Sequence, residues 1–243
     1  MSSNTLNPTG LAASGREAAA TPRTVKVWDV PTRVFHWLLA LSFAGAYLTS
    51  ESERYRDIHV MLGYTLAGLI GFRLVWGLIG TRYARFGSFL FGPARVVEYL
   101  KSLLTTSPRH YLGHNPAGAV AIFLLLALGL LTAASGFATY QEVGGEWLEE
   151  LHEGAAATML AVVGVHVAGV LVSSFLHREN LVRAMVTGDK QGAPGQGILK
   201  ARAAVGILLL AAVLGFWTAD RAGWIPAPTT QGQEQGQKHH QHD

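Results

Sequence analysis

Two histidines fourteen residues apart, His152 and His166, lie within one largely apolar stretch of the sequence. An α-helix turns about 100° and rises about 1.5 Å per residue, so this spacing corresponds to almost four full turns and a rise of roughly 21 Å. Both imidazoles therefore face the same side of a helix, at two depths. A bilayer hydrocarbon core is about 30 Å thick, and ionisable side chains inside it are costly enough to indicate function. The spacing predicts two stacked cofactors, one near each membrane boundary.

The composition favours a membrane protein, because 49% of the residues are hydrophobic and only 14% are charged. Apolar runs of nearly bilayer-spanning length are found at residues 34–49, 58–79, 117–139, 154–176 and 203–218. We therefore predict an all-α integral membrane protein with five transmembrane helices, of which the first is the shortest. The residues before the first run lack the apolar core of a secretion signal and are expected to form a cytoplasmic tail.

Basic residues are distributed unevenly among the segments that connect these runs. Most Lys and Arg residues precede the first run, separate the second from the third, or follow the fourth. The connection between the third and fourth runs instead carries Glu142, Glu146, Glu149 and Glu150 and has no Lys or Arg. Because cytoplasmic loops keep the basic residues, the N-terminus is predicted to be cytoplasmic and the C-terminus periplasmic in a bacterial inner membrane. The basic isoelectric point then reflects topology, and no nucleic-acid partner is expected.

This orientation assigns a depth to four histidines. His36 lies near the cytoplasmic start of the first run, and His59 lies near the outer start of the second. The fourth run descends from the outer side, which places His152 outside and His166 inside. Depth matching therefore pairs His36 with His166 near the cytoplasm and His59 with His152 near the outer face.

Haem b suits two such pairs, because its iron takes one axial imidazole from each side of a planar ring. The chain has no cysteine, which excludes covalent c-type haem attachment through Cys and iron–sulfur ligation by Cys. Zinc usually takes three or four clustered ligands, which two separate pairs do not provide. We therefore predict two non-covalent haem b groups.

A histidine in a membrane helix can instead hydrogen-bond a neighbouring helix, but four that sort into two depth-matched pairs favour ligation. His110, His114 and His177 lie at the cytoplasmic ends of the third and fourth runs and are expected to be interfacial. His177 is the principal rival ligand, because it follows His166 by eleven residues and faces a similar direction about 16 Å further along the helix.

Two arginines are candidates for contact with an anion. Arg73 follows His59 by fourteen residues and is expected on the same helix face at the cytoplasmic level. It can bind a haem propionate or a quinone carbonyl, or its long side chain can snorkel to the headgroups. Arg33, one turn before His36, is a second propionate candidate, although the positive-inside rule also explains its position at the membrane edge.

Several short stretches of the sequence carry a family resemblance. They are Val27-Trp28-Asp29, Arg33-Val34-Phe35-His36-Trp37, Asp57-Ile58-His59-Val60-Met61-Leu62-Gly63-Tyr64, Phe72-Arg73-Leu74-Val75-Trp76-Gly77, Tyr111-Leu112-Gly113-His114-Asn115-Pro116-Ala117-Gly118, Leu151-His152-Glu153, His166-Val167-Ala168-Gly169 and His177-Arg178-Glu179-Asn180-Leu181. Together they resemble the bacterial cytochrome b-561 family, which includes the b-type cytochrome subunits of nickel–iron hydrogenases. The resemblance covers roughly residues 25–190.

The resemblance implies a four-helix dihaem bundle that moves electrons between the membrane quinone pool and a periplasmic redox partner, either cytochrome c or a dehydrogenase such as hydrogenase. It assigns the haem-ligand roles to His36, His59, His152 and His166, in agreement with the depth argument. The predicted organisation is a disordered tail at 1–24, the dihaem domain at 25–190, a flexible linker at 191–202, a fifth transmembrane helix at 203–219 and a polar tail at 220–243. The His-rich end of that tail is expected to be disordered, with weak metal binding as the alternative.

Two other function classes are compatible with the sequence. A stand-alone oxidoreductase would use quinone and a small outer-side molecule such as superoxide, without a protein partner. A non-redox membrane anchor or transporter would use the histidines for helix contacts and would bind no stoichiometric haem. Neither an internal repeat nor a pair of broken helices of the kind found in transporters is visible in the sequence.

Overall fold

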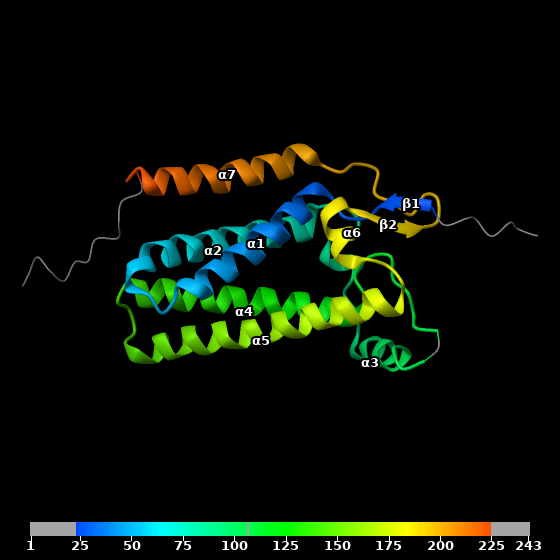
Figure 1. The fold of residues 1–243 in the computed structure, drawn as a ribbon, viewed down its shortest axis with the longest axis horizontal. Helices are drawn as coiled ribbons and strands as arrows, with labels where there is room; N and C mark the ends of the chain where they lie inside the picture. The colour runs from blue at the N-terminus through cyan, green and yellow to red at the C-terminus, as the bar shows by residue number, and fades with distance from the viewer. Residues whose placement is uncertain (1–22, 106, 225–243) are drawn as a thin grey trace, which may run out of the picture.

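A computed structural model describes residues 23–105 and 107–224 of the chain. Four long helices lie side by side in a bundle: α1 (Val30–Thr49), α2 (Arg56–Ile79), α4 (Pro116–Tyr140) and α5 (Glu146–Leu176) (Figure 1). α1 packs against α2, α2 against α4, and α4 against α5. α7 (Ala203–Arg221) lies along the α1–α2 side of this bundle. The helical membrane architecture predicted from the sequence is confirmed.

The bundle interior is a single apolar cluster contributed by several helices. Its buried members are Phe35, Phe43, Leu66, Leu69, Ile70, Leu126, Met159 and Val213. Many large apolar side chains point outward instead, as expected for helices whose outer faces contact lipid.

Within the described part of the chain, four helical segments are long and apolar enough to cross a membrane: Glu53–Ile79, Pro116–Tyr140, Glu146–Leu176 and Ala203–Arg221. The first predicted span is not among these four. It forms the 20-residue helix α1, which packs against α2 and α7. Its hydropathy falls below that of the other four because Arg33 and His36 lie in its first two turns. α7 begins where the fifth apolar run was predicted, and its Trp217 Nε1 donates a hydrogen bond of 2.8 Å to Thr65 Oγ1 on α2.

Polar caps set the helix starts that position the histidines. The Asp29 carboxylate accepts from the Thr32 amide at 2.8 Å and begins α1, with a proline in the first turn. Asn115 caps α4 in the same way, accepting from the Gly118 amide at 2.7 Å. Before α5 the chain turns at Gly144 and Gly145, whose φ angles of 91° and 74° favour glycine.

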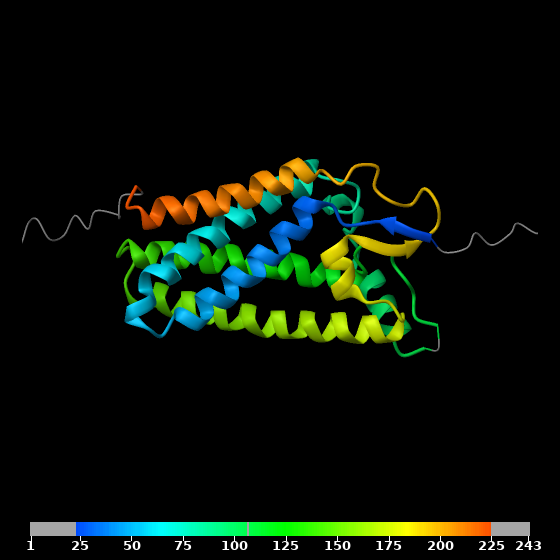
Figure 2. The same cartoon turned by 45° about the horizontal axis from the view of Figure 1, so that its top comes forward.

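The remaining elements gather at one end of the bundle, called here the sheet end (Figure 2). They are β1 (Arg23–Lys26), η2 (Phe86–Ser88), α3 (Pro93–Ser102), α6 (Leu181–Thr187) and β2 (Asp189–Gly192). β1 and β2 pair antiparallel, with Arg23 opposite Gly192 and Lys26 opposite Asp189. The opposite end, called the hairpin end, holds the α1–α2 connection with η1 (Glu53–Tyr55) and the α4–α5 connection.

The two strands were not predicted from the sequence, and they lie across the predicted domain boundaries at 24/25 and 190/191. They bring the segment before α1 against the segment after α6, although more than 160 residues separate the two in sequence. The predicted N-terminal tail and the polar His-rich tail lie almost entirely outside the described residues.

Candidate cofactor sites between facing histidines

His59 on α2 faces His152 on α5 near the hairpin end, with ring centroids 6.0 Å apart and ring planes at 78°. The Nδ1 of His59 lies 2.8 Å from the Ala46 carbonyl oxygen, and the Nδ1 of His152 lies 2.9 Å from the Thr132 carbonyl oxygen. Because a carbonyl only accepts, both Nδ1 atoms donate, and each Nε2 keeps a lone pair. A backbone hydrogen bond that orients a ring in this way is typical of a metal-ligating histidine.

A glycine on α4 makes room for the His152 ring. A Cβ at Gly136 would lie 2.6 Å from His152 Cε1 and 2.8 Å from its Nδ1. These distances are too short for any side chain, so only glycine allows the ring to lie against the α4 backbone. The bond to the Thr132 carbonyl, one turn earlier on α4, depends on this close approach.

His36 on α1 faces His166 on α5 near the sheet end, with ring centroids 6.5 Å apart and ring planes at 54°. The His36 ring meets Trp37 edge-on at 5.2 Å, and its Nδ1 is buried without a hydrogen-bond partner. α1 and α5 need not contact each other directly to hold this pair, because α6, which follows α5, is hydrogen-bonded to α1. Carbonyl groups at the end of α6 accept from Arg33 Nη1 and Trp37 Nε1 of α1.

Both pairs fit a metal that takes two axial imidazoles. Two imidazoles that coordinate one ion from opposite sides, each with a metal–nitrogen distance of about 2 Å, have ring centres roughly 6 Å apart. No cluster of three or more His, Cys, Asp or Glu residues suited to a metal ion occurs within residues 23–105 and 107–224. The donor sets therefore suit an ion that a planar ring already holds, rather than a bare ion such as zinc.

Arg73 is buried inside the bundle, with 3% of its surface exposed, so its side chain does not snorkel to the headgroups. Its guanidinium lies 4.7 Å from the Phe86 ring centre and 6.0 Å from that of Phe89, and its Nη1 has no hydrogen-bond partner. The nearby Asp29 carboxylate already accepts from Trp76 Nε1 and from the Thr81 hydroxyl.

The three histidines predicted to be interfacial have different environments. His177 ends α5, and its two ring nitrogens lie 2.9 Å and 3.3 Å from the carbonyl oxygens of Ser173 and Arg109. His110 lies half exposed beside Glu179, with a nitrogen–oxygen distance of 3.2 Å. His177 therefore has neither a free nitrogen nor a facing partner among the four predicted ligands.

His114 lies at the sheet end just before α4, as expected of an interfacial residue, but aromatic side chains enclose its ring. Its ring lies between Trp28 and Phe89, at centroid distances of 4.6 Å and 4.3 Å, and its Nδ1 is buried without a partner. The sequence contained one indication of this, since His114 directly precedes the Asn115-Pro116 cap and must lie where α4 enters the bundle.

Glu179 organises the sheet end just beyond α5. Its carboxylate lies 3.2 Å from Lys190 Nζ and from His110 Nε2, and it accepts from the Gln191 amide. Burial alone would raise its pKa, but the hydrogen bond from His110 and the charge of Lys190 outweigh burial and lower the pKa to about 2. The group is therefore a fixed anion at neutral pH.

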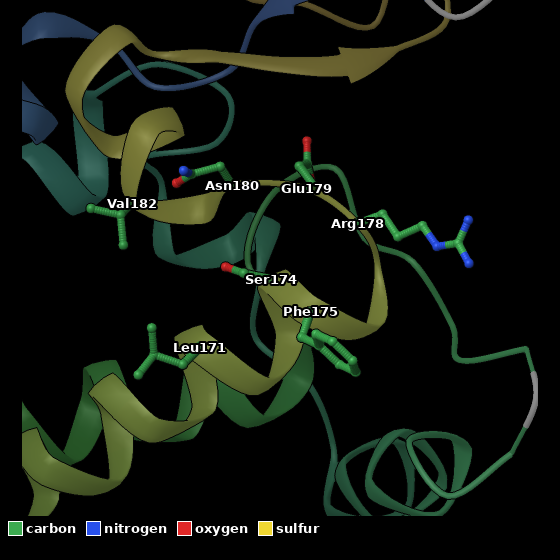
Figure 3. Close-up of a pocket in the computed structure, with 7 residues that line it drawn as sticks. All are labelled: Leu171, Ser174, Phe175, Arg178, Glu179, Asn180 and Val182. Carbon is green, nitrogen blue, oxygen red and sulfur yellow. The ribbon is translucent and has the colours of Figure 1, made fainter.

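A surface cavity of about 390 Å³ adjoins this anion, between the end of α5 and the start of α6 (Figure 3). Leu171 and Ser174 on α5 lie on one side of it and Asn180 and Val182 on the other, while Arg178 extends away. Phe175, which is 84% exposed, belongs to the same wall. The cavity thus combines exposed apolar side chains with polar ones.

A family model described as prokaryotic cytochrome b561 matches residues 27–188. The chain belongs to this family. Among curated relatives of this cytochrome, the probable Ni/Fe-hydrogenase B-type cytochrome subunit of Rhizobium leguminosarum bv. viciae is 26% identical over 233 residues, covering 76% of this chain and 97% of the relative. The corresponding protein of Azotobacter vinelandii is 27% identical over 222 residues, covering 72% of this chain and 91% of the relative. No solved structure matches the chain.

As a b-type cytochrome, the protein binds haem b and transfers electrons in a membrane. The family predicted from the sequence motifs is confirmed, and membership in it excludes a non-redox anchor or transporter. The matched residues contain α1 to α6 and all four facing histidines, whereas α7 lies beyond them.

Proposed function

We propose that the chain holds two haems b, one between His36 and His166 and the other between His59 and His152, and passes electrons between the two faces of a bacterial inner membrane. The observation that supports this most strongly is the spacing of the two facing ring pairs, 6.5 Å and 6.0 Å, on opposite ends of one bundle. Bound haem supplies one-electron redox chemistry at each site. The chain itself holds the imidazoles in place and surrounds them with apolar side chains.

The proposed topology places the sheet end in the cytoplasm and the hairpin end in the periplasm. Basic side chains near the sheet end, including Arg82, Arg85 and Arg183, support this orientation. So do Glu142 in the α4–α5 connection and the glutamates in the first turns of α5, at the hairpin end. α7 ends near the hairpin end, which would deliver the C-terminus to the periplasm.

Quinone is the proposed membrane substrate, and the cavity beside α5 is its proposed site. Leu171 and Phe175 offer an apolar rim at the lipid face, and Ser174 and Asn180 offer polar groups for a quinone head. The cavity adjoins the helix that carries His166, which favours exchange with the sheet-end haem.

A periplasmic redox protein is the proposed partner of the hairpin-end haem. The names of the relatives describe hydrogenase subunits, so a hydrogenase is the preferred partner and cytochrome c the second candidate. Glu146, Glu149 and Glu150 open α5 beside His152 and give this end an acidic surface, which suits a partner with a basic surface. No observation favours superoxide or another small molecule as the outer-side reactant.

Haem content tests the haem placement directly. Purified unsubstituted protein is expected to contain two haems b per chain by pyridine haemochrome and reduced-minus-oxidised spectra. His36→Ala and His166→Ala are expected to lose one and the same haem, and His59→Ala and His152→Ala the other. His177→Ala is the matched control and should retain both. Loss of a haem in His177→Ala, with full content in His166→Ala, would overturn the proposal.

A further inference from the structure

Several unpartnered polar atoms belong to residues at the sheet end, which is also the end of the bundle that holds the His36–His166 pair. Within the described part of the chain, nine buried side-chain nitrogen or oxygen atoms have no hydrogen-bond partner. Four of them belong to basic or imidazole side chains at this end, namely Arg33 Nε, His36 Nδ1, Arg73 Nη1 and His114 Nδ1. Buried donors without acceptors are costly, so such a group indicates a ligand that accepts hydrogen bonds.

Arg73 is a buried cation without a bound anion. In the described residues no carboxylate lies within 4 Å of its guanidinium, and the nearby Asp29 carboxylate accepts instead from Trp76 Nε1 and the Thr81 hydroxyl. Phe86 and Phe89 cover one side of the guanidinium. Because a buried charge needs a partner, this environment calls for an anion from outside the polypeptide.

His114 shares a wall with Arg73. The Phe89 side chain is 1% exposed, and its ring centroid lies 4.3 Å from that of His114. The same ring lies beside the Arg73 guanidinium. Burial, and after it the charge of Arg73, lowers the pKa of His114 to about 3, so the imidazole is neutral at pH 7 and carries one N–H donor. Arg73 and His114 therefore lie against the same buried aromatic ring at the sheet end.

We propose that Arg73 and His114 bind the propionate carboxylates of the haem held by His36 and His166, an inference that rests on the haem placement proposed above. A carboxylate accepts from a guanidinium and from an imidazole N–H, and it neutralises the buried charge. Trp28 and Phe89 hold the His114 ring at a fixed angle, so its donor is oriented before the ligand arrives. The role of His114 is to bind the carboxylate end of the cofactor, not its iron.

The reduction potential of each haem, measured by potentiometric titration of haem-loaded full-length protein, tests this proposal. The sheet-end haem is identified as the one missing from His36→Ala. Removing a cation beside a propionate disfavours reduction, so Arg73→Gln is expected to lower the reduction equilibrium constant of this haem about tenfold, which is about 59 mV for one electron. His114→Phe should lower it several-fold, while Arg73→Lys should retain most of the unsubstituted value.

Two control variants and a modified cofactor sharpen the test. Arg82→Gln and His110→Phe alter half-buried or exposed groups at the same end and should leave both potentials unchanged. Retention of the hairpin-end haem shows that a variant has folded. Arg73→Gln should weaken retention of haem b at the sheet-end site, but it should not weaken retention of haem b dimethyl ester, which lacks the free carboxylates that Arg73 would bind.

The outcomes of these measurements distinguish failure of the propionate assignment from failure of the proposed haem placement. Unchanged sheet-end potentials in both Arg73→Gln and His114→Phe would overturn the propionate assignment, as would an equal loss of retention in Arg73→Gln for haem b and for its dimethyl ester. A loss of quinone turnover with both potentials unchanged would also overturn it, and would assign the two residues to quinone. Absence of haem from the His36–His166 pair in the unsubstituted protein would instead refute the proposed function.

Discussion

Gly136→Ala is expected to eject or misplace the hairpin-end haem while leaving the sheet-end haem in place. The added methyl group would lie 2.6 Å and 2.8 Å from two atoms of the His152 ring, which is held on the same side by its bond to the Thr132 carbonyl. The ring must therefore turn away from α4, and its Nε2 must leave the direction of His59.

The free-energy cost of Gly136→Ala is the sum of two unfavourable contributions and one favourable contribution. Overpacking costs about 1–3 kcal/mol, and loss of the His152–Thr132 hydrogen bond adds about 0.5–1.5 kcal/mol. Replacing glycine by alanine inside a helix returns up to about 1 kcal/mol. We expect a net loss of roughly 1–3 kcal/mol, concentrated on the His152 position rather than spread over the bundle.

Haem stoichiometry and the thermal loss of each haem band measure this effect. Gly215→Ala on α7 is the matched control, because a Cβ there meets nothing within 4 Å, and it should keep both haems with equal or greater thermal stability. Full hairpin-end haem content in Gly136→Ala, with an unchanged spectrum, would refute the reasoning.

Three further predictions concern stability. Trp217→Phe should lower the free energy of unfolding by about 0.5–1.5 kcal/mol, because it removes the 2.8 Å bond to Thr65; in a Thr65→Val background the same change should cost clearly less, and an equal cost would exclude that bond. Asp29→Ala should lower the thermal midpoint, because it removes the α1 cap, worth about 0.5–2 kcal/mol, and also the acceptor of Trp76 Nε1 and Thr81; an unchanged midpoint would contradict both roles. Glu179 has a folded pKa near 2, below its unfolded value, so its stabilisation is present above about pH 4.3 and is lost as the pH falls through about 2. Glu179→Gln should therefore lower the thermal midpoint at pH 7 and flatten its decline in acid, and an unchanged acid profile would argue against this network.

Much of the fold could be predicted from local pattern. The apolar runs at 117–139 and 203–218 lie within one to three residues of α4 and α7, because a bilayer-spanning helix must be continuous and apolar. The fourteen-residue spacing in α5 likewise places His152 and His166 near opposite ends of the bundle. Their role as haem ligands is still a prediction.

Other features depend on contacts between distant segments and had no local signal. β1 and β2 have four residues each and are defined only by their pairing across more than 160 residues. The enclosure of the His114 ring was not predicted, because it depends on Trp28 and Phe89, which come from two other connections. Gly136 was not singled out from the sequence, because the need for glycine there arises from the His152 ring on the neighbouring helix.

The sequence by itself determined the long helices, the cytochrome family and the end of the bundle at which each of the four paired histidines lies, because hydropathy and helical periodicity are properties of single segments. Only the tertiary structure decided which carbonyl orients His59 and His152, which aromatic rings enclose His114, and that Arg73 is buried without an anion. Those features arise where the side chains of several helices meet, and the direction of a hydrogen bond or the closeness of two backbones is defined only once the helices are packed.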